Sequence, residues 1–250
     1  MLTEHGKASI AQVVFWAPAV IPALILLFHR HGAPRMPWVI LVLFALIRIT
    51  CGIVVIVLQN RPQDVGLIIA AHVLLNAGVF PLVAAAFGLL LIVIIRDFPD
   101  DKRIRNAFIF LRVVFITGIS LVIAGGCLES NYWDPHDVSL GYKLTKAGYI
   151  LVTIFEASLI YFQWYCWRKR ETISVASCTA LQGMFAAVPF LIIRIAYLYL
   201  PVFRASDPKW DQLTGSIAPY VVMGLLMEYI VFMIFLATGF LIPPIKVVNA

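Results

Sequence analysis

Seven apolar stretches of membrane-spanning length constrain the fold of this chain more than any other feature of its sequence. About 20 consecutive apolar residues form a helix that crosses the hydrocarbon core of a bilayer. The spans are predicted at residues 8–28, 38–58, 66–95, 107–127, 145–167, 178–202 and 217–241. The sequence therefore predicts an all-α polytopic membrane protein, with residues 1–250 forming one seven-helix bundle. The third span is long enough to tilt, or to kink at Pro81.

The composition agrees with this class. Hydrophobic residues make up 62% of the chain and charged residues 13%. A soluble domain typically has about 45–50% apolar residues and about 25% charged residues. In a membrane protein the net charge of +6 reports topology, so it does not indicate nucleic-acid binding.

Basic residues in the connections predict the orientation of the bundle, because cytoplasmic loops are enriched in Lys and Arg. One side carries ten of them: Arg30, Arg35, Arg96, Lys102, Arg103, Arg105, Arg168, Lys169, Arg170 and Lys246. The other side carries six: Lys7, Arg61, Lys143, Lys146, Arg204 and Lys209. This difference predicts an N-terminus outside and a C-terminus in the cytoplasm.

Four ionisable side chains fall near the centres of spans: Arg48, Glu156, Arg194 and Glu228. A charge at the centre of a membrane helix costs about 2.5–3.5 kcal/mol on insertion scales. Four unpaired charges would together cost on the order of 10 kcal/mol, which is as much as the net stability of a domain. The numbers therefore predict two Arg–Glu ion pairs.

Helical spacing places these charges on inward faces. Tyr149, Thr153, Glu156 and Gln163 form one stripe, and Tyr220, Gly224 and Glu228, then Ala45, Arg48 and Gly52, form two others. Arg194 has Tyr197 three residues further on, and His72 and Asn76 are four residues apart. Converging stripes predict a polar cavity near the midplane that opens to the non-cytoplasmic side, where His72 lies.

Such a cavity suits acid/base chemistry on a lipophilic molecule. An apolar environment disfavours a charged carboxylate, so a buried Glu can keep its proton and act as a general acid, while a second Glu beside Arg stays ionised. We expect Glu228 and Glu156 to be the catalytic pair. The tuning and substrate-binding residues would be Arg48, Arg194, His72, Asn76, Tyr197, Gln163 and Tyr149.

Neither a cofactor nor a metal is expected, because no phosphate-binding glycine loop, zinc-binding helix motif or aspartate-rich diphosphate motif is present. The loop residues Glu129, Asp134, His136 and Asp137 have the right chemistry for a metal. Their spacing is more typical of an exposed acidic loop.

Other roles remain open for the same charges. Paired buried charges can act as structural pins that fix helix register. They can also form the site or gate of a lipid or small-molecule transporter, or of a membrane sensor, with no chemical conversion. A purely structural or adaptor protein is a further alternative.

Three segments resemble a family of fungal seven-helix integral membrane proteins. They are IAQVVFWAPAV followed by RHG, LIRITCG, and VPFLIIRIAYLYL followed by VVMGLLMEYIVFMIFLATGF. The helix count and the late Arg and Glu residues are also similar, more distantly, to the fungal lipid-translocating exporter family.

We expect an integral membrane protein of the endoplasmic reticulum or another endomembrane. Similar small fungal membrane proteins are tailoring enzymes of secondary metabolism, including membrane-bound terpene cyclases and epoxide hydrolases. These use intramembrane carboxylates to open an epoxide or protonate an alkene, which gives cyclisation or hydration. The meroterpenoid cyclases carry their acids in sequence surroundings that this chain lacks.

Overall fold

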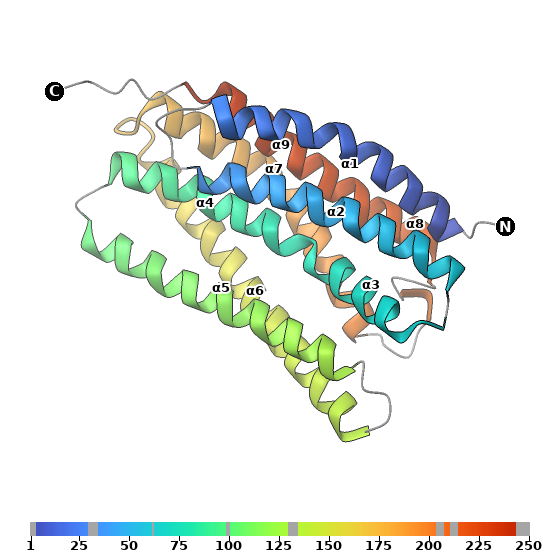
Figure 1. Ribbon diagram of the computed structural model, residues 1–250. Coiled ribbons are helices and arrows are strands. Elements are labelled where there is room, and N and C mark those ends of the chain that lie inside the picture. The colour runs from blue at the N-terminus through green and yellow to red at the C-terminus, as the bar shows by residue number, and fades with distance from the viewer. Residues whose placement is uncertain are drawn as a thin grey trace.

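The computed structural model describes residues 4–29, 35–61, 63–98, 101–129, 135–203, 208–210 and 215–243, and every regular element within them is a helix (Figure 1). In chain order the elements are α1 (Glu4–His29), α2 (Met36–Asn60), α3 (Val65–Ala77), α4 (Val79–Asp97), α5 (Lys102–Glu129), α6 (Pro135–Arg168), α7 (Val175–Phe203), the 3₁₀ turn η1 (Pro208–Trp210), α8 (Ile217–Pro219), the π-helix η2 (Tyr220–Leu226) and α9 (Met227–Leu241).

Seven helical segments of the described chain are long and apolar enough to cross a membrane, as a multi-pass integral membrane protein requires. They lie at the seven predicted positions. Most extend beyond the predicted spans, and the fifth begins at His136 rather than at 145, because polar residues continue the helix past its apolar part. The third span combines α3 and α4, and the seventh combines α8, η2 and α9.

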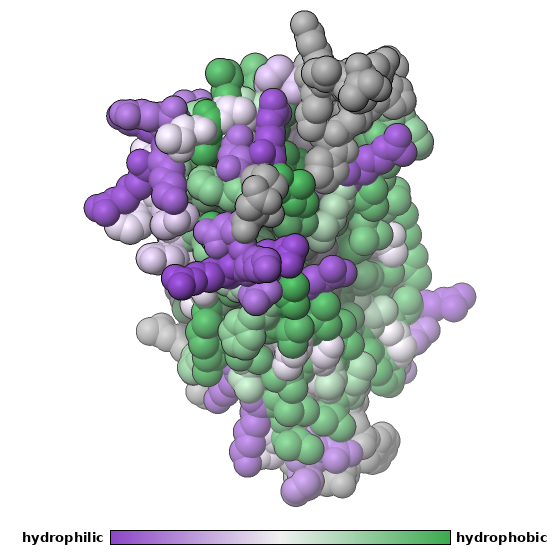
Figure 2. All heavy atoms as spheres, turned by 90° about the vertical axis from the view of Figure 1, so that its left-hand side faces the viewer, coloured by the Kyte–Doolittle hydropathy of each residue, from purple (hydrophilic) through white to green (hydrophobic). Residues whose placement is uncertain are grey.

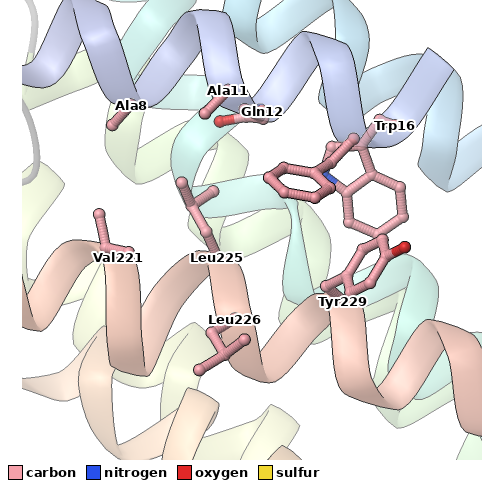
Figure 3. A pocket seen from close by; sticks show the side chains of 9 residues that line it. Ala8, Ala11, Gln12, Trp16, Val221, Leu225, Leu226 and Tyr229 are labelled. Carbon is pink, nitrogen blue, oxygen red and sulfur yellow. The ribbon is translucent and has the colours of Figure 1, made fainter.

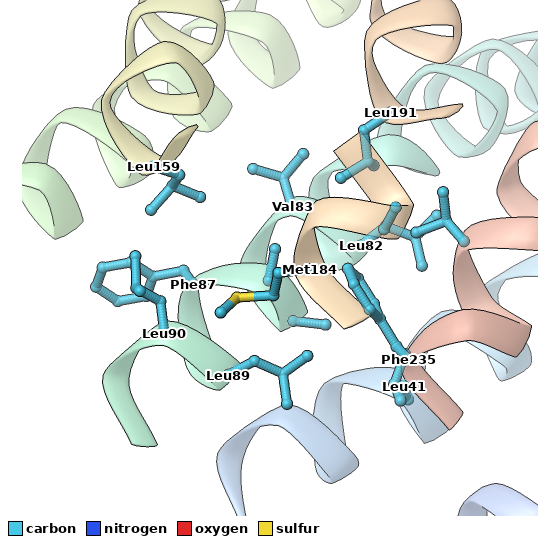
Figure 4. Close-up of a cluster of buried hydrophobic side chains, with 14 of the residues drawn as sticks. Leu41, Leu82, Val83, Phe87, Leu89, Leu90, Leu159, Met184, Leu191 and Phe235 are labelled. Atoms are coloured by element: carbon cyan, nitrogen blue, oxygen red, sulfur yellow. The ribbon is translucent and has the colours of Figure 1, made fainter. Parts of the chain in front are cut away.

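Helix α4 is the central helix of the bundle. Thirteen of its 19 residues are buried, and α2, α6, α7 and α9 all pack against it. Figure 4 shows Leu82 and Phe87 of α4 surrounded by Leu159 of α6, Leu191 of α7 and Phe235 of α9. Small residues on α4, among them Ala85, Ala86 and Gly88, let the neighbouring helices approach it closely, which suits a central position in a membrane bundle.

The third span is interrupted one turn before Pro81, where the sequence predicts a kink. Helix α3 ends at Ala77, Gly78 forms a turn, and α4 begins at Val79. The ring of Pro81 clashes with the carbonyl of the residue four positions earlier, which is Ala77, and proline has no N–H to bond with it. The interruption leaves carbonyls at the end of α3 without their usual helical donors.

The seventh span contains a second irregularity. After the three-residue α8, the chain follows a π-helix from Tyr220 to Leu226 before it becomes an α-helix again at Met227. π-Helices are rare, and they occur preferentially at functional sites because the wider turn changes the direction of the side chains that follow. Glu228 is the second residue after the end of this π-helix.

Helices α5 and α6 form a tightly packed antiparallel pair on one flank of the bundle (Figure 1). A Cβ atom added at Gly141 would lie 2.8 Å from the carbonyl oxygen of Gly125, and one added at Gly148 would lie 2.8 Å from that of Gly118. Small residues let two membrane helices approach this closely, which brings their backbones into van der Waals contact.

The first residue of α1 and the last residue of α9 lie at opposite ends of the bundle, as an odd number of spans requires (Figure 1). Figure 2 looks onto the end where α4 and α6 finish and α5 and α7 start, and hydrophilic side chains gather there above apolar flanks. Lys169 contacts two rings at this end, since its ammonium group lies 4.8 Å from the centre of the Tyr165 ring and 5.3 Å from that of Phe98.

Candidate functional site

The central feature of the bundle is a cluster of three buried charges, Arg48 on α2, Arg194 on α7 and Glu228 on α9. Arg194 Nε donates to Glu228 Oε1 at 2.6 Å, and Arg48 Nη2 donates to the same oxygen. The three side chains are 1%, 3% and 0% exposed. We call these residues the charge cluster.

The predicted arrangement of two separate ion pairs is wrong, because both guanidinium groups contact Glu228. Glu156 on α6 is 3% exposed, and neither of its oxygens has a hydrogen-bond partner among the described residues. The two carboxyl groups predicted to act as a pair therefore have opposite surroundings: one is held by two cations and the other by none.

The interruption between α3 and α4 lies beside the charge cluster. Arg194 Nη2 donates to the carbonyl of Leu75 at 3.4 Å, near the C-terminus of α3, where a cation also interacts favourably with the helix dipole. Arg48 occupies the space beside Gly78, since a Cβ atom at that position would overlap its guanidinium group. The break in the third span thus supplies both an acceptor and room for the arginines.

A polar contact links the charge cluster to α1. Gln12 Nε2 donates to the carbonyl oxygen of Arg48 at 2.6 Å, and Tyr220 donates to Gln12 Oε1 at 3.4 Å. Gln12 was not among the predicted site residues. The signal that could have found it is an isolated amide in the apolar run of the first span, where a polar side chain needs a partner.

A pocket of about 260 Å³ lies between α1 and the η2–α9 segment (Figure 3). Ala8, Ala11 and Gln12 of α1 face Val221, Leu225 and Leu226 across it, and Trp16 and Tyr229 lie at one end. Phe15 is 59% exposed and Leu226 is 45% exposed, so the pocket lies at the surface of the bundle. The small side chains of Ala8 and Ala11 leave the space that it occupies.

This pocket differs from the predicted cavity. Its lining is mostly apolar, and none of the four central charges contributes to it. Gln12 belongs to both the pocket and the hydrogen-bonded contact with the backbone of Arg48, so it connects the two features.

The remaining predicted site residues occupy several places. Tyr197 is buried beside the cluster, with Arg194 Cζ 5.5 Å from the centre of its ring. Tyr149 and Gln163 are buried on α6, where the Tyr149 hydroxyl and Gln163 Oε1 have no hydrogen-bond partner among the described residues. His72 is half-buried on α3. Asn76 lies on α3 too, and its side chain is outside the described part of the structure.

The acidic loop is only partly described, since Asp134 lies outside the described residues. Glu129 accepts a hydrogen bond from Thr145 Oγ1 at 2.7 Å. No three His, Cys, Asp or Glu side chains in the described ranges gather as metal ligands.

The chain belongs to the family described as a domain of unknown function, DUF7702, whose sequence profile matches residues 2–244. Searches of curated proteins and of solved structures found no match.

Proposed function

We propose that this protein is a transporter that takes a lipophilic small molecule from the bilayer into the pocket between α1 and the η2–α9 segment. One observation carries the proposal: Gln12 lines that pocket and donates to the backbone of Arg48, so an occupant of the pocket contacts a side chain bonded to the charge cluster. Ligand pockets are typically apolar with a few well-placed polar groups.

The helix irregularities favour transport. Transporter sites lie near the midplane of the membrane, where interrupted helices meet. Here the α3–α4 interruption supplies Leu75 and Gly78 to the charge cluster, and the π-helix η2 ends two residues before Glu228. The span that contains η2 lines the pocket, so it would have to move if the pocket opened to one side of the membrane and then to the other.

The charge cluster itself speaks against Glu228 as a general acid. Its Oε1 accepts from two guanidinium groups, so this oxygen is already engaged as an acceptor and does not face the pocket. In a transporter the same cluster holds α2, α7 and α9 together, and it can rearrange when one of these helices moves.

The proposed transporter sits with its N-terminus outside and its C-terminus in the cytoplasm. The support is the basic loops: Arg96 lies at the end of α4, Lys102 and Arg103 begin α5, and Arg168 to Arg170 lie at and after the end of α6. These helix ends belong to the end of the bundle onto which Figure 2 looks. An endomembrane such as the endoplasmic reticulum is the proposed compartment.

The test is uptake of a fluorescent lipophilic probe by liposomes that contain the purified protein. Ala11→Phe fills the pocket, whereas Val14→Phe adds a ring on the same helix outside it. We expect the first variant to abolish uptake and the second to retain it. Equal uptake in both variants would sink the assignment of the pocket. Saturable binding without uptake would indicate a sensor in place of a transporter.

A second candidate function is the membrane-embedded acid/base enzyme, and Glu156 is the observation that favours it. A buried carboxyl group with no hydrogen-bond partner among the described residues resembles a general acid kept protonated by apolar surroundings. Membranes incubated with a lipophilic epoxide, and analysed by mass spectrometry, would show cyclised or hydrated product. Glu156→Gln should eliminate that product, and Glu171→Gln, at an exposed position, should not.

A further inference from the structure

The charge cluster contains more positive than negative charge. Arg48 and Arg194 share the single carboxylate of Glu228, and the neighbouring Cys51, Tyr197 and Tyr220 are of types that are neutral at pH 7. Glu156 is bonded to neither arginine. A net positive charge is therefore enclosed by apolar helices, where it needs a counter-ion more than at any exposed position.

Unused donors identify the place for that counter-ion. Arg48 Nε and Arg194 Nη1 have no hydrogen-bond partner among the described residues, although both side chains are at least 97% buried. Glu228 Oε2 is likewise without a donor there, so the free guanidinium nitrogens outnumber the free carboxylate oxygen. Guanidinium groups bind carboxylates and similar oxyanions through such N–H groups.

The pocket identifies the rest of the ligand. Its walls are apolar, and Gln12 is shared between the pocket and the Arg48 backbone. We propose, building on the transporter function, that the ligand is a lipophilic anion. Its apolar chain occupies the pocket beside Trp16 and Leu226, and its anionic head reaches the arginines past Gln12.

Guanidinium groups can bind either the anionic head of a lipophilic ligand or a free inorganic anion, because both carry negative charge. A chain-bearing anion would also fill the pocket, whereas chloride would satisfy only the cluster. Brominated probes separate the two, because bromine quenches a tryptophan that it touches and Trp16 lines the pocket. The purified protein is titrated with a brominated fatty acid, the alcohol of equal chain length, and chloride, with Trp16→Phe identifying the signal from the pocket.

We expect the acid to bind at least about tenfold more tightly than the alcohol, as removal of one charge-assisted interaction would predict. Equal binding of acid and alcohol at Trp16 would overturn the anion inference and leave the proposed function intact. If neither probe quenches Trp16, the proposed function fails too. Competition by chloride that leaves no preference for the acid would also overturn the inference, since the counter-ion would then be inorganic.

Charge variants test the same point with opposite signs. Arg194→Gln removes the excess positive charge and should weaken binding of the acid about tenfold, whereas Glu228→Gln increases it and should strengthen binding. The double variant Arg194→Gln, Glu228→Gln restores a single positive charge and should bind as the wild type does. Glu171→Gln, at an exposed position, is the control and should leave binding unchanged. A loss of binding in all the variants of the cluster, or a change with Glu171→Gln, would contradict the inference.

Discussion

Glu228 and Glu156 are two buried acids on apolar helices of the same bundle, and they differ in almost everything else. Glu228 lies between α2, α7 and α9 and accepts from two arginines, whereas Glu156 on α6 has no hydrogen-bond partner in the described part of the chain. The difference teaches that depth in the membrane does not determine the role of a carboxyl group. The role depends on which neighbouring helices present cations to it.

The largest effect should come from removing the carboxylate between the arginines. Glu228→Leu leaves two buried guanidinium groups without an anion, and breaking a buried ion pair costs about 3–5 kcal/mol. The measurement is thermal unfolding in detergent, followed by circular dichroism. Replacement of all three cluster residues, Arg48→Met, Arg194→Met and Glu228→Leu, is the control, because it removes every charge and should restore much of the lost stability. Wild-type stability in Glu228→Leu would show that the ion pairs do not hold the helices.

A smaller effect is expected where α3 and α4 meet. Gly78→Val introduces a side chain into space occupied by the Arg48 guanidinium, so the arginine has to move away from Glu228. Overpacking of this kind costs about 1–3 kcal/mol. The same unfolding measurement applies. Gly66→Val is the comparison, since a Cβ atom there meets only Asp64. Equal losses in both variants would argue against a specific contact with Arg48.

Removing the carboxyl group of Glu156 should raise the stability of the protein, whereas removing that of Glu228 should lower it. Glu156→Leu removes a buried carboxyl group that no described residue satisfies, and each such group costs about 1–3 kcal/mol. The variant should therefore melt at a higher temperature than the wild type, with a gain of about 1 kcal/mol. A marked destabilisation would mean that Glu156 has a partner that holds the fold, and the contrast with Glu228 would disappear.

The smallest effect concerns the link between the cluster and the pocket. Tyr220→Phe removes a hydrogen bond of 3.4 Å to Gln12, and a single neutral hydrogen bond contributes about 0.5–1.5 kcal/mol, with a bond this long at the low end. Stability should change by roughly 0.5 kcal/mol or less. Gln12→Leu should cost more, because it also leaves the Arg48 carbonyl without the donor at 2.6 Å. A larger loss of stability in Tyr220→Phe than in Gln12→Leu would mean that the bond from Tyr220 contributes more than the bond from Gln12 to Arg48.

Much of the fold follows from local patterns. The seven spans follow from runs of apolar residues, and the interruption before Pro81 follows from the proline ring, because both effects involve residues close in sequence. The burial of Arg48, Glu156, Arg194 and Glu228 also follows, since a charge in a membrane helix faces the protein interior. No sequence signal predicts the π-helix. Pro219 and Gly224 lie in or beside it, but proline and glycine are also common in regular membrane helices.

The site was less predictable. The sequence by itself placed four ionisable side chains near the centres of apolar spans, on stripes expected to face inward. Only the tertiary structure decided that Arg48 and Arg194 both reach Glu228, that Glu156 does not share them, and that Gln12 joins the cluster to a pocket. Partner choice depends on how α1, α2, α7 and α9 are rotated and shifted against one another. That arrangement results from the packing of whole helix faces, which the spacing of residues along one helix does not contain.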